Sequence, residues 1–457
     1  MADSLMKQII IWFLFTIIFA GKMFGQNPAN EANNISTTSP THAESAAPAQ
    51  HEEVNASPAE SNGHDQQAHT MEGASETGGH ESGHSFDPKS TAFHHISDLN
   101  VYSIGPWNFP LPCILYAPSM GWSVFSSSRF GIDNAHHGNG NHAVDGYVLN
   151  HGRVNRIQGD FPKGIVDIQG FHSKKIEHNG KSHDQDFVII NQQEYALDKP
   201  STADAGLFGG GITSFYDFSI TKNVFSMLLV VLLLSWLFIG MAKQYKKAPG
   251  TPPSGAQLLM EPLILFIQDE VAKPFLGPKW EKFIPMLLAI FFFVLGLNLF
   301  GQIPFLGGSN VTGNLSVTMV LALIAFVVVN LNGNKHYWQH IFWMPGIPAW
   351  VKTILTPVEI LGVFIKPLTL MLRLFANITA GHMAILIFIS LIFIFGNSGG
   401  NVGAGLGASI GSGLLTVFMM SIELLVALIQ AFVFTLLTAS YIGAATEEHA
   451  HAEHDHH

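Results

Sequence analysis

The chain has 457 residues, of which 47% are hydrophobic and 12% charged, and its formal net charge is -11. This acidic balance offers no basic surface to nucleic acid, so we expect no nucleic-acid partner. The single cysteine, Cys113, excludes an internal disulfide framework. The polar residues are concentrated in the first half and the long apolar runs in the second, so the two halves predict different kinds of structure.

The first 90 residues predict exported segments that have no packed core. Residues 1–25 place Lys7 before an apolar run from Ile9 to Ala20, which is typical of a signal peptide; an uncleaved anchor is the alternative. Residues 26–90 are rich in Ala, Ser, Glu, Asn and His and predict a disordered tether. Its six histidines lack the spacing of a structural metal site, so a solvated tether is favoured over a metal scavenger. They are His42, His51, His64, His69, His80 and His84.

Residues 91–215 predict a small exported domain rich in strands. Short β-branched or aromatic runs such as VYSIGPWNF and DFVIINQQEYAL are separated by Gly, Pro, Asn and Asp. The histidine pairs His94/His95 and His136/His137 could suggest metal binding. No HExxH motif or Cys/His grid accompanies them, so structural roles are favoured. Nothing in this segment indicates what the domain does.

Residues 216–446 predict an all-α polytopic membrane domain with about five spans. The spans are Val224–Met241, Phe283–Phe300, Leu315–Leu331, the run through Arg373 to Phe395, and Leu414–Ile442. Gln257–Ala272 mixes apolar and acidic residues, as an interfacial helix does. The last two spans are predicted to be long and tilted, because Leu355–Phe395 would be about 60 Å as a helix, twice the hydrocarbon thickness. Gly396–Gly413 is predicted to be a glycine-rich loop joining them.

The distribution of lysines predicts how these spans are oriented. The connection from Ala242 to Lys282 holds six lysines, whereas the connections Gly301–Gly313 and Gly396–Gly413 hold no Lys or Arg. The lysine-rich side is therefore expected to be cytoplasmic. This places residues 91–215 outside and the His/Glu-rich tail, 447–457, in the cytoplasm. A native tail and a purification tag are equally compatible with its composition.

Arg373 is the residue around which the membrane domain is interpreted. It lies between Leu372 and Leu374 inside an apolar run. An arginine stays charged in a protein, and a lone one at the centre of a bilayer costs between about 3 and more than 10 kcal/mol. The cost implies a partner of opposite charge. No spare carboxylate lies near Arg373 on its own span, so another subunit is expected to supply it.

The fifth span carries polar residues on one face. Glu423 and Gln430 are seven residues apart, nearly two helical turns, so they share that face at about 10 Å from each other. Tyr441 follows on the same face, about 16 Å nearer the cytoplasm. For Gln430 an ordinary interhelical hydrogen bond is the alternative to a functional role.

The fourth span carries a complementary set. Asn377 lies one turn after Arg373, and an ordinary interhelical hydrogen bond is again the alternative. His382 lies about 13 Å towards the outside and is expected to meet Glu423 if the two spans are antiparallel. Glu359 lies roughly 21 Å towards the cytoplasm. Titratable groups on both sides of a fixed positive charge suggest two proton pathways that do not meet.

Two stretches are similar to a known family. Lys366–His382 reads KPLTLMLRLFANITAGH, with an arginine inside LRLFAN, after KP and before AGH. This resembles the signature helix of subunit a of the F-type ATP synthase, and Ile422–Tyr441 resembles the last helix of that family. The similarity extends loosely from about Phe218 to Glu448. The preceding 215 residues are not part of it.

The resemblance implies a non-catalytic stator subunit of the Fo proton channel in the bacterial inner membrane. It implies that H⁺ passes through two offset half-channels to and from a carboxylate of the c-subunit ring, and that b-type stalk subunits are further partners. It implies no cofactor or metal, and no GxxxxGK[ST] loop is present. The matching site residues are Arg373 (facing the ring carboxylate), Asn377, Gln430, His382 with Glu423 (outer half-channel, in swapped order), and Glu359 and Tyr441 (inner half-channel).

Two other functions remain open at this point. A stand-alone transition-metal transporter would use the exported histidines, but it needs closely spaced His/Asp/Glu ligands on facing spans and has no use for Arg373. A sensor with an exported domain and a membrane anchor would need a cytoplasmic output domain, and only loops and a tail are present.

Overall fold

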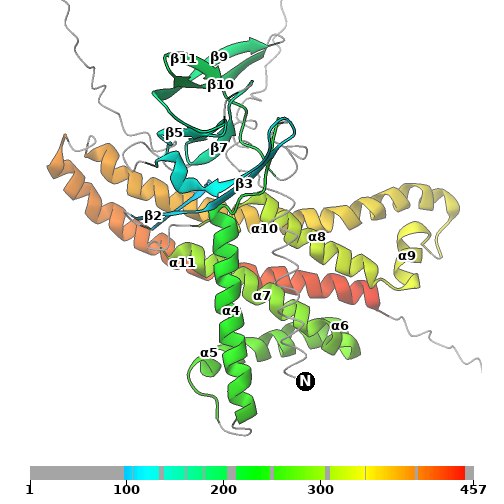
Figure 1. Ribbon diagram of the computed structural model, residues 1–457. Helices are drawn as coiled ribbons and strands as arrows, with labels where there is room; N and C mark the ends of the chain where they lie inside the picture. The colour runs from blue at the N-terminus through cyan, green and yellow to red at the C-terminus, as the bar shows by residue number, and fades with distance from the viewer. Residues whose placement is uncertain are drawn as a thin grey trace, which may run out of the picture.

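The computed structural model describes a strand-rich domain followed by a bundle of helices (Figure 1). The described residues are 97–104, 107–132, 138–159, 161, 163–178, 181–202, 213–247, 252–303, 309–344, 346–396 and 400–447. The predictions for the signal peptide, the tether, the two histidine pairs and the tail after residue 447 lie outside these ranges.

The predicted strand-rich domain is present, and its described strands form four antiparallel sheets. In chain order the strands are β1 (Val101–Ile104), β2 (Trp107–Pro110), β3 (Pro112–Ala117), β4 (Gly121–Ser126), β5 (His142–Val144), β6 (Tyr147–Asn150), β7 (Arg153–Arg156), β8 (Ile165–Asp167), β9 (Gly170–His178), β10 (Lys181–Ile190), β11 (Gln193–Ala196) and β12 (Tyr216–Asp217). The sheets have the orders β1-β2, β12-β3-β4, β7-β6-β5-β8 and β11-β10-β9. Strand β12 leads directly into the first long helix.

Two apolar clusters hold this domain together. Along β3 exposed and buried residues alternate, so that Cys113, Leu115 and Ala117 enter the first cluster. Val188 and Leu197 belong to the second cluster, beneath β10. Burial raises the pKa of the Cys113 thiol to about 12. Cys113 therefore behaves as a small hydrophobic side chain rather than as a nucleophile.

The strand domain is joined to the first long helix, α4 (Lys222–Lys247), by hydrogen bonds that complete the start of that helix. Asp98 accepts bonds from the Thr221 hydroxyl at 2.8 Å and from the Asn223 amide at 2.9 Å. The Lys222 amide donates to the carbonyl of Leu99 at 2.7 Å. An aspartate that accepts from the first amides of a helix contributes about 1 kcal/mol. The strand domain thus supplies the cap of α4.

Asp217 should make the stability of the strand domain depend on pH. Burial raises its pKa from 3.8 to about 6, although Ser219 donates to the carboxylate at 2.8 Å. Because the folded-state pKa is the higher one, Asp217 stabilises the fold below pH 4, and this contribution is lost as the pH rises through 6. We expect Asp217→Asn to stabilise the domain at pH 7 by roughly 1 to 3 kcal/mol. Hydrogen exchange of β3 and β12 between pH 4 and 7 measures this.

Asp184→Asn is the matched control for that measurement, because Asp184 is exposed on β10. It should leave the exchange rates of β3 and β12 unchanged at every pH. Equal pH dependence in Asp217→Asn and in the parent protein would contradict the assignment to Asp217.

The predicted polytopic helical domain is confirmed. Four helical segments of the described chain are long and apolar enough to cross a membrane, or five if the bent pair α8 and α9 counts as one span. The helices after α4 are α5 (Ala256–Phe266), α6 (Lys273–Leu276), α7 (Trp280–Gln302), α8 (Leu315–Leu331), α9 (Lys335–Phe342), α10 (Ala349–Phe395) and α11 (Val402–Thr446). A π-helical turn, Ile267–Ala272, links α5 to α6. Helix α7 is buried along most of its length.

Helices α10 and α11 are long and pack against each other. They have 47 and 45 residues and cross α4 at a large angle in Figure 1. At 1.5 Å per residue each would be about 70 Å long, so neither can stand upright in a bilayer. Pro357 and Pro367 both lie inside α10. Much of the apolar surface of the two helices remains exposed in the isolated chain, as at Leu368, Leu372, Val417 and Leu424.

The expected glycine-rich loop from Gly396 to Gly413 is wrong for most of its length, because α11 already begins at Val402. Glycine destabilises helices in water, but in hydrocarbon the helix is the structure that satisfies every backbone group. The small residues also let the helices approach closely. A Cβ added to Gly405 would lie 3.3 Å from the Cα of Gly396. The sequence analysis also did not predict α9, a short helix with the sequence KHYWQHIF. Its mixture of charged, polar and aromatic residues resembles that of a connecting segment.

Candidate functional site

Arg373 lies on the outward face of α10. Its neighbours Leu370, Met371 and Leu374 are buried against the other helices, whereas Leu372 and Arg373 are exposed. Within the described part of the chain, the guanidinium makes no hydrogen bond or ion pair. A charge on an apolar helix without an intrachain partner is stable in a membrane only if another body provides one.

Asn377 and Gln430 connect the two long helices one turn from Arg373. The Asn377 amide donates to the Gln430 side-chain carbonyl at 2.9 Å. Gln430 is 3% exposed, whereas Asn377 is exposed beside the arginine. The bridge fixes the register of α10 against α11 directly behind Arg373.

His382 and Glu423 lie together further along the same antiparallel pair. Their Nδ1 and Oε1 atoms are 3.4 Å apart, and the side chains are 16% and 4% exposed. The ideal Cβ of Gly381 would lie 3.1 Å from the same Glu423 oxygen. Glycine at position 381 therefore gives the carboxylate room to reach the imidazole. A histidine and a glutamate at this distance can pass a proton between them.

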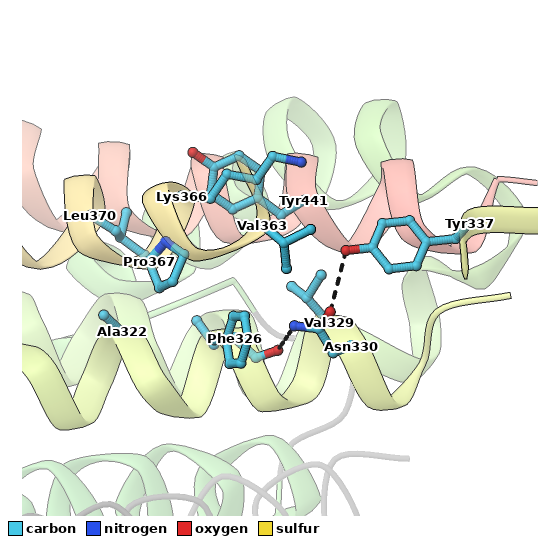
Figure 2. A pocket seen from close by; sticks show the side chains of 11 residues that line it. Ala322, Phe326, Val329, Asn330, Tyr337, Val363, Lys366, Pro367, Leu370 and Tyr441 are labelled. Atoms are coloured by element: carbon cyan, nitrogen blue, oxygen red, sulfur yellow. Dashed lines mark hydrogen bonds between the residues drawn. The ribbon is translucent and has the colours of Figure 1, made fainter. Parts of the chain in front are cut away.

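Lys366 and Tyr441 lie on the other side of Arg373, where α8, α9, α10 and α11 surround a small cavity (Figure 2). The Lys366 ammonium lies 5.5 Å from the centre of the Tyr441 ring. Figure 2 also shows the Tyr337 hydroxyl donating to the Asn330 side chain at 3.3 Å. The cavity volume of about 20 Å³ is enough for one water molecule. Tyr441 thus lies at the wall of a mostly apolar cavity whose polar lining residues are Asn330, Tyr337, Lys366 and Tyr441 itself.

Glu359 is separate from this cavity. It is half-buried on α10 and does not line the cavity, although its charge acts on Tyr337, which does. The structure therefore groups the predicted residues into an outer pair, a central trio of Arg373, Asn377 and Gln430, and an inner region with Tyr441 at its wall and Glu359 beside it.

Sequence reasoning missed a buried polar loop that follows α7. Thr312 donates to Asn298 at 2.6 Å, and Asn298 donates to the carbonyl of Ala427, one turn from Glu423, at 3.3 Å. The signal was present in the run SNVTG, Ser309–Gly313, which we interpreted only as part of a connection.

Comparison with known proteins decides the family. Residues 224–443 match the family described as ATP synthase A chain. The chain is 37% identical over 246 residues to ATP synthase subunit a of Chlorobium phaeobacteroides, covering 52% of this chain and 69% of that protein. It is 39% identical to ATP synthase subunit a 2 of Chlorobaculum tepidum (53% and 67% covered) and 37% identical to ATP synthase subunit a of Myxococcus xanthus (52% and 77%). The chain belongs to the ATP synthase subunit a family.

As a subunit a, the protein is a multi-pass membrane component of ATP synthase and forms the stator side of its proton channel. The family match begins at residue 224, after the strand domain. Residues 91–166 match a separate family, described only as a domain of unknown function (DUF8433). This subunit a therefore carries an additional domain whose role the family name does not give.

The metal-transporter alternative gains no support from these observations. Among the residues that the structure describes, no three His, Cys, Asp or Glu side chains are grouped so that they could hold a metal ion. The relatives are named for ATP synthase, not for metal transport.

Proposed function

We propose that this subunit a moves protons through two half-channels that end on either side of Arg373, and that the proton is carried between them by a carboxylate of a c-subunit ring. The single observation that carries this proposal is the Arg373 guanidinium, which is exposed on an apolar face and has no counter-charge within the described chain. The exposed apolar surface of α10 and α11 provides the face against which a ring of helices turns.

The outer half-channel ends at His382 and Glu423. A proton arriving from outside is taken up by this pair, whose facing atoms are 3.4 Å apart, and is passed to the ring carboxylate. Gln430 and Asn377, bonded at 2.9 Å, hold α10 and α11 in register so that the pair and the arginine keep their spacing.

Arg373 separates the two half-channels. Its fixed positive charge repels a free cation that would otherwise pass directly from one side to the other. When a protonated ring carboxylate reaches it, the guanidinium favours the ionised form and the proton leaves. The vacated carboxylate then pairs with Arg373 until rotation carries it on.

The inner half-channel receives the released proton on the lysine-rich side. The cavity bounded by Tyr441, Lys366 and Asn330 and the nearby Glu359 are the polar groups along this direction. Each charge that crosses a potential of about 100 mV yields about 2.3 kcal/mol for rotation. On this proposal the strand domain lies outside the bacterial inner membrane, the end of α11 lies in the cytoplasm, and b-type stalk subunits hold the chain in place.

A photocrosslinking experiment tests the proposed partner. Ala376 is exposed on α10 and lies on the same stripe as Arg373. A photoreactive amino acid at position 376 of the assembled ATP synthase should crosslink to the c subunit. The same amino acid at Leu232, which is 66% exposed on α4, serves as the control and should crosslink to lipid or other subunits. A ring crosslink at 232 and none at 376 would refute the assigned face.

A further inference from the structure

The loop before α8 forms a buried polar layer at the end of the bundle that lies next to the strand domain. Its side chains and backbone reach three different helices. Ser309 donates to Asn223 on α4 at 3.3 Å, Thr312 bonds to Asn298 on α7, and Thr379 on α10 donates to the carbonyl of Gly313 at 3.3 Å. The polar side chains of this loop and of the first turn of α8 are at most 3% exposed: Ser309, Asn310, Thr312, Asn314 and Ser316.

Several amide groups in this layer have no hydrogen-bond partner among the described residues. Asn223 Nδ2, Asn310 Nδ2 and Gln302 Nε2 are buried donors without a hydrogen bond to any described residue. Asn223 and Asn310 are each 3% exposed. Leaving such a donor unsatisfied is unfavourable, so buried donors of this kind are satisfied by water. The three donors lie on α4 (Asn223), on α7 (Gln302) and in the loop (Asn310). Their burial without partners indicates that water enters this layer.

The polar layer continues to the proton-transfer pair. A Cβ added to Gly301 would lie 2.7 Å from the carbonyl oxygen of Ser309 and 3.7 Å from His382 Nε2. The loop and the imidazole therefore both lie next to the position that a side chain at residue 301 would occupy. Because residue 301 is glycine, that position is empty of side-chain atoms. His382 Nδ1 is turned to Glu423, so the ring has one nitrogen towards the polar layer and one towards the carboxylate.

The strand domain covers the other end of this layer. In Figure 1 it lies over the first turn of α4, where Asp98 accepts from the Asn223 amide at 2.9 Å. Lys222, the first residue of α4, is 5% exposed, and its amide donates to the carbonyl of Leu99 in the strand domain at 2.7 Å. Polar groups are therefore present both where the layer meets the strand domain and where it approaches His382.

We propose that the strand domain forms the mouth of the outer half-channel. Water and protons enter between this domain and the first turn of α4, pass Asn223, Ser309 and Gln302, and reach His382 and Glu423. This inference rests on the proposed function of the pair and assigns a role to a domain that the family match does not cover. The acceptor for the incoming proton is His382 Nε2, and the proton leaves the pair through Glu423.

Accessibility of single cysteines to Ag⁺ tests this route. Asn223→Cys and, separately, Gln302→Cys are placed in the assembled ATP synthase in right-side-out vesicles loaded with ADP and phosphate. Ag⁺ added outside should bind each thiol and lower ATP synthesis driven by an outside-acid gradient at least tenfold. Protection of the thiol from later alkylation in denaturant reports Ag⁺ binding independently of activity. Cys113 is buried and stays in place.

Two further cysteines control for access. Trp107→Cys, at a site 69% exposed on the strand domain, should bind Ag⁺ without loss of ATP synthesis. Leu232→Cys, at a site 66% exposed in the apolar middle of α4, should not react, because lipid is expected to cover it. If positions 223 and 302 resist Ag⁺ while position 107 reacts, or react without loss of synthesis, the proposed mouth is refuted. Arg373→Ala distinguishes failure of this route from failure of the proposed function. If Arg373→Ala is inactive while the cysteine results refute the mouth, the proposed half-channel mechanism is retained and only the entry route is wrong.

Discussion

Replacing Arg373 with alanine is expected to abolish ATP-driven proton pumping, by about 100-fold or more, while ATP synthase still assembles. The variant loses the charge that makes a passing carboxylate release its proton and that keeps the two half-channels apart. A 100-fold loss corresponds to about 2.7 kcal/mol, which is modest beside the interaction of two charges in a low-dielectric interface. Acidification of inverted vesicles on addition of ATP measures the effect.

Lys352→Ala is the matched control, because Lys352 is a cation near the start of α10, where its ammonium lies 4.5 Å from the centre of the Trp343 ring. It should pump at close to the parental rate. Arg373 is exposed and makes no bond within the described chain, so its loss should not unfold the helix pair. Normal pumping by Arg373→Ala would refute the proposed mechanism, and loss of the assembled complex would contradict the purely electrostatic role given to the arginine.

The second large effect is expected at the outer pair. Glu423→Gln and His382→Ala should each slow proton pumping about 10- to 100-fold, because either change breaks the relay between two groups that lie 3.4 Å apart. The double variant should be little slower than the slower single variant, since both residues serve one step. Pumping rates of the three variants, each normalised to the amount of assembled complex, measure this coupling.

Ser421→Ala is the control for that series. Ser421 lies two residues before Glu423 on α11, is exposed, and donates to the carbonyl of Val417 on its own helix. It should pump normally, as should a variant in which the six histidines of residues 26–90 are replaced. Multiplicative losses in the His382/Glu423 double variant would show that the two residues act independently, against the proposed relay.

The membrane helices were largely predictable because their signals are local. An apolar run such as Leu315–Leu331 is recognised from composition alone, and α8 has those bounds. The meeting of His382 with Glu423 was also predictable, since helical geometry and an antiparallel pairing place both at one level. Predicting this pair needs only the residue spacing along each helix and the assumption that the two helices are antiparallel neighbours.

Contacts between distant segments were not predictable in the same way. Asp98 caps α4 across more than 120 residues of chain, and Gly301 leaves space between Ser309 and His382. Neither relation has a local pattern in the sequence. The helical start of α11 at Val402 was missed for another reason, since glycine-rich segments are loops in water but helices where backbone groups have no water to bind.

The cap on α4 also has a consequence for the order in which the protein folds and inserts into the membrane. Asp98 and Leu99 precede the first spanning helix by more than a hundred positions, yet they satisfy its first amides. In the topology proposed above, the strand domain is translocated before the helix that it completes is inserted. The start of α4 then reaches its final form only after that domain has folded, so a folding defect there would delay maturation of the membrane domain.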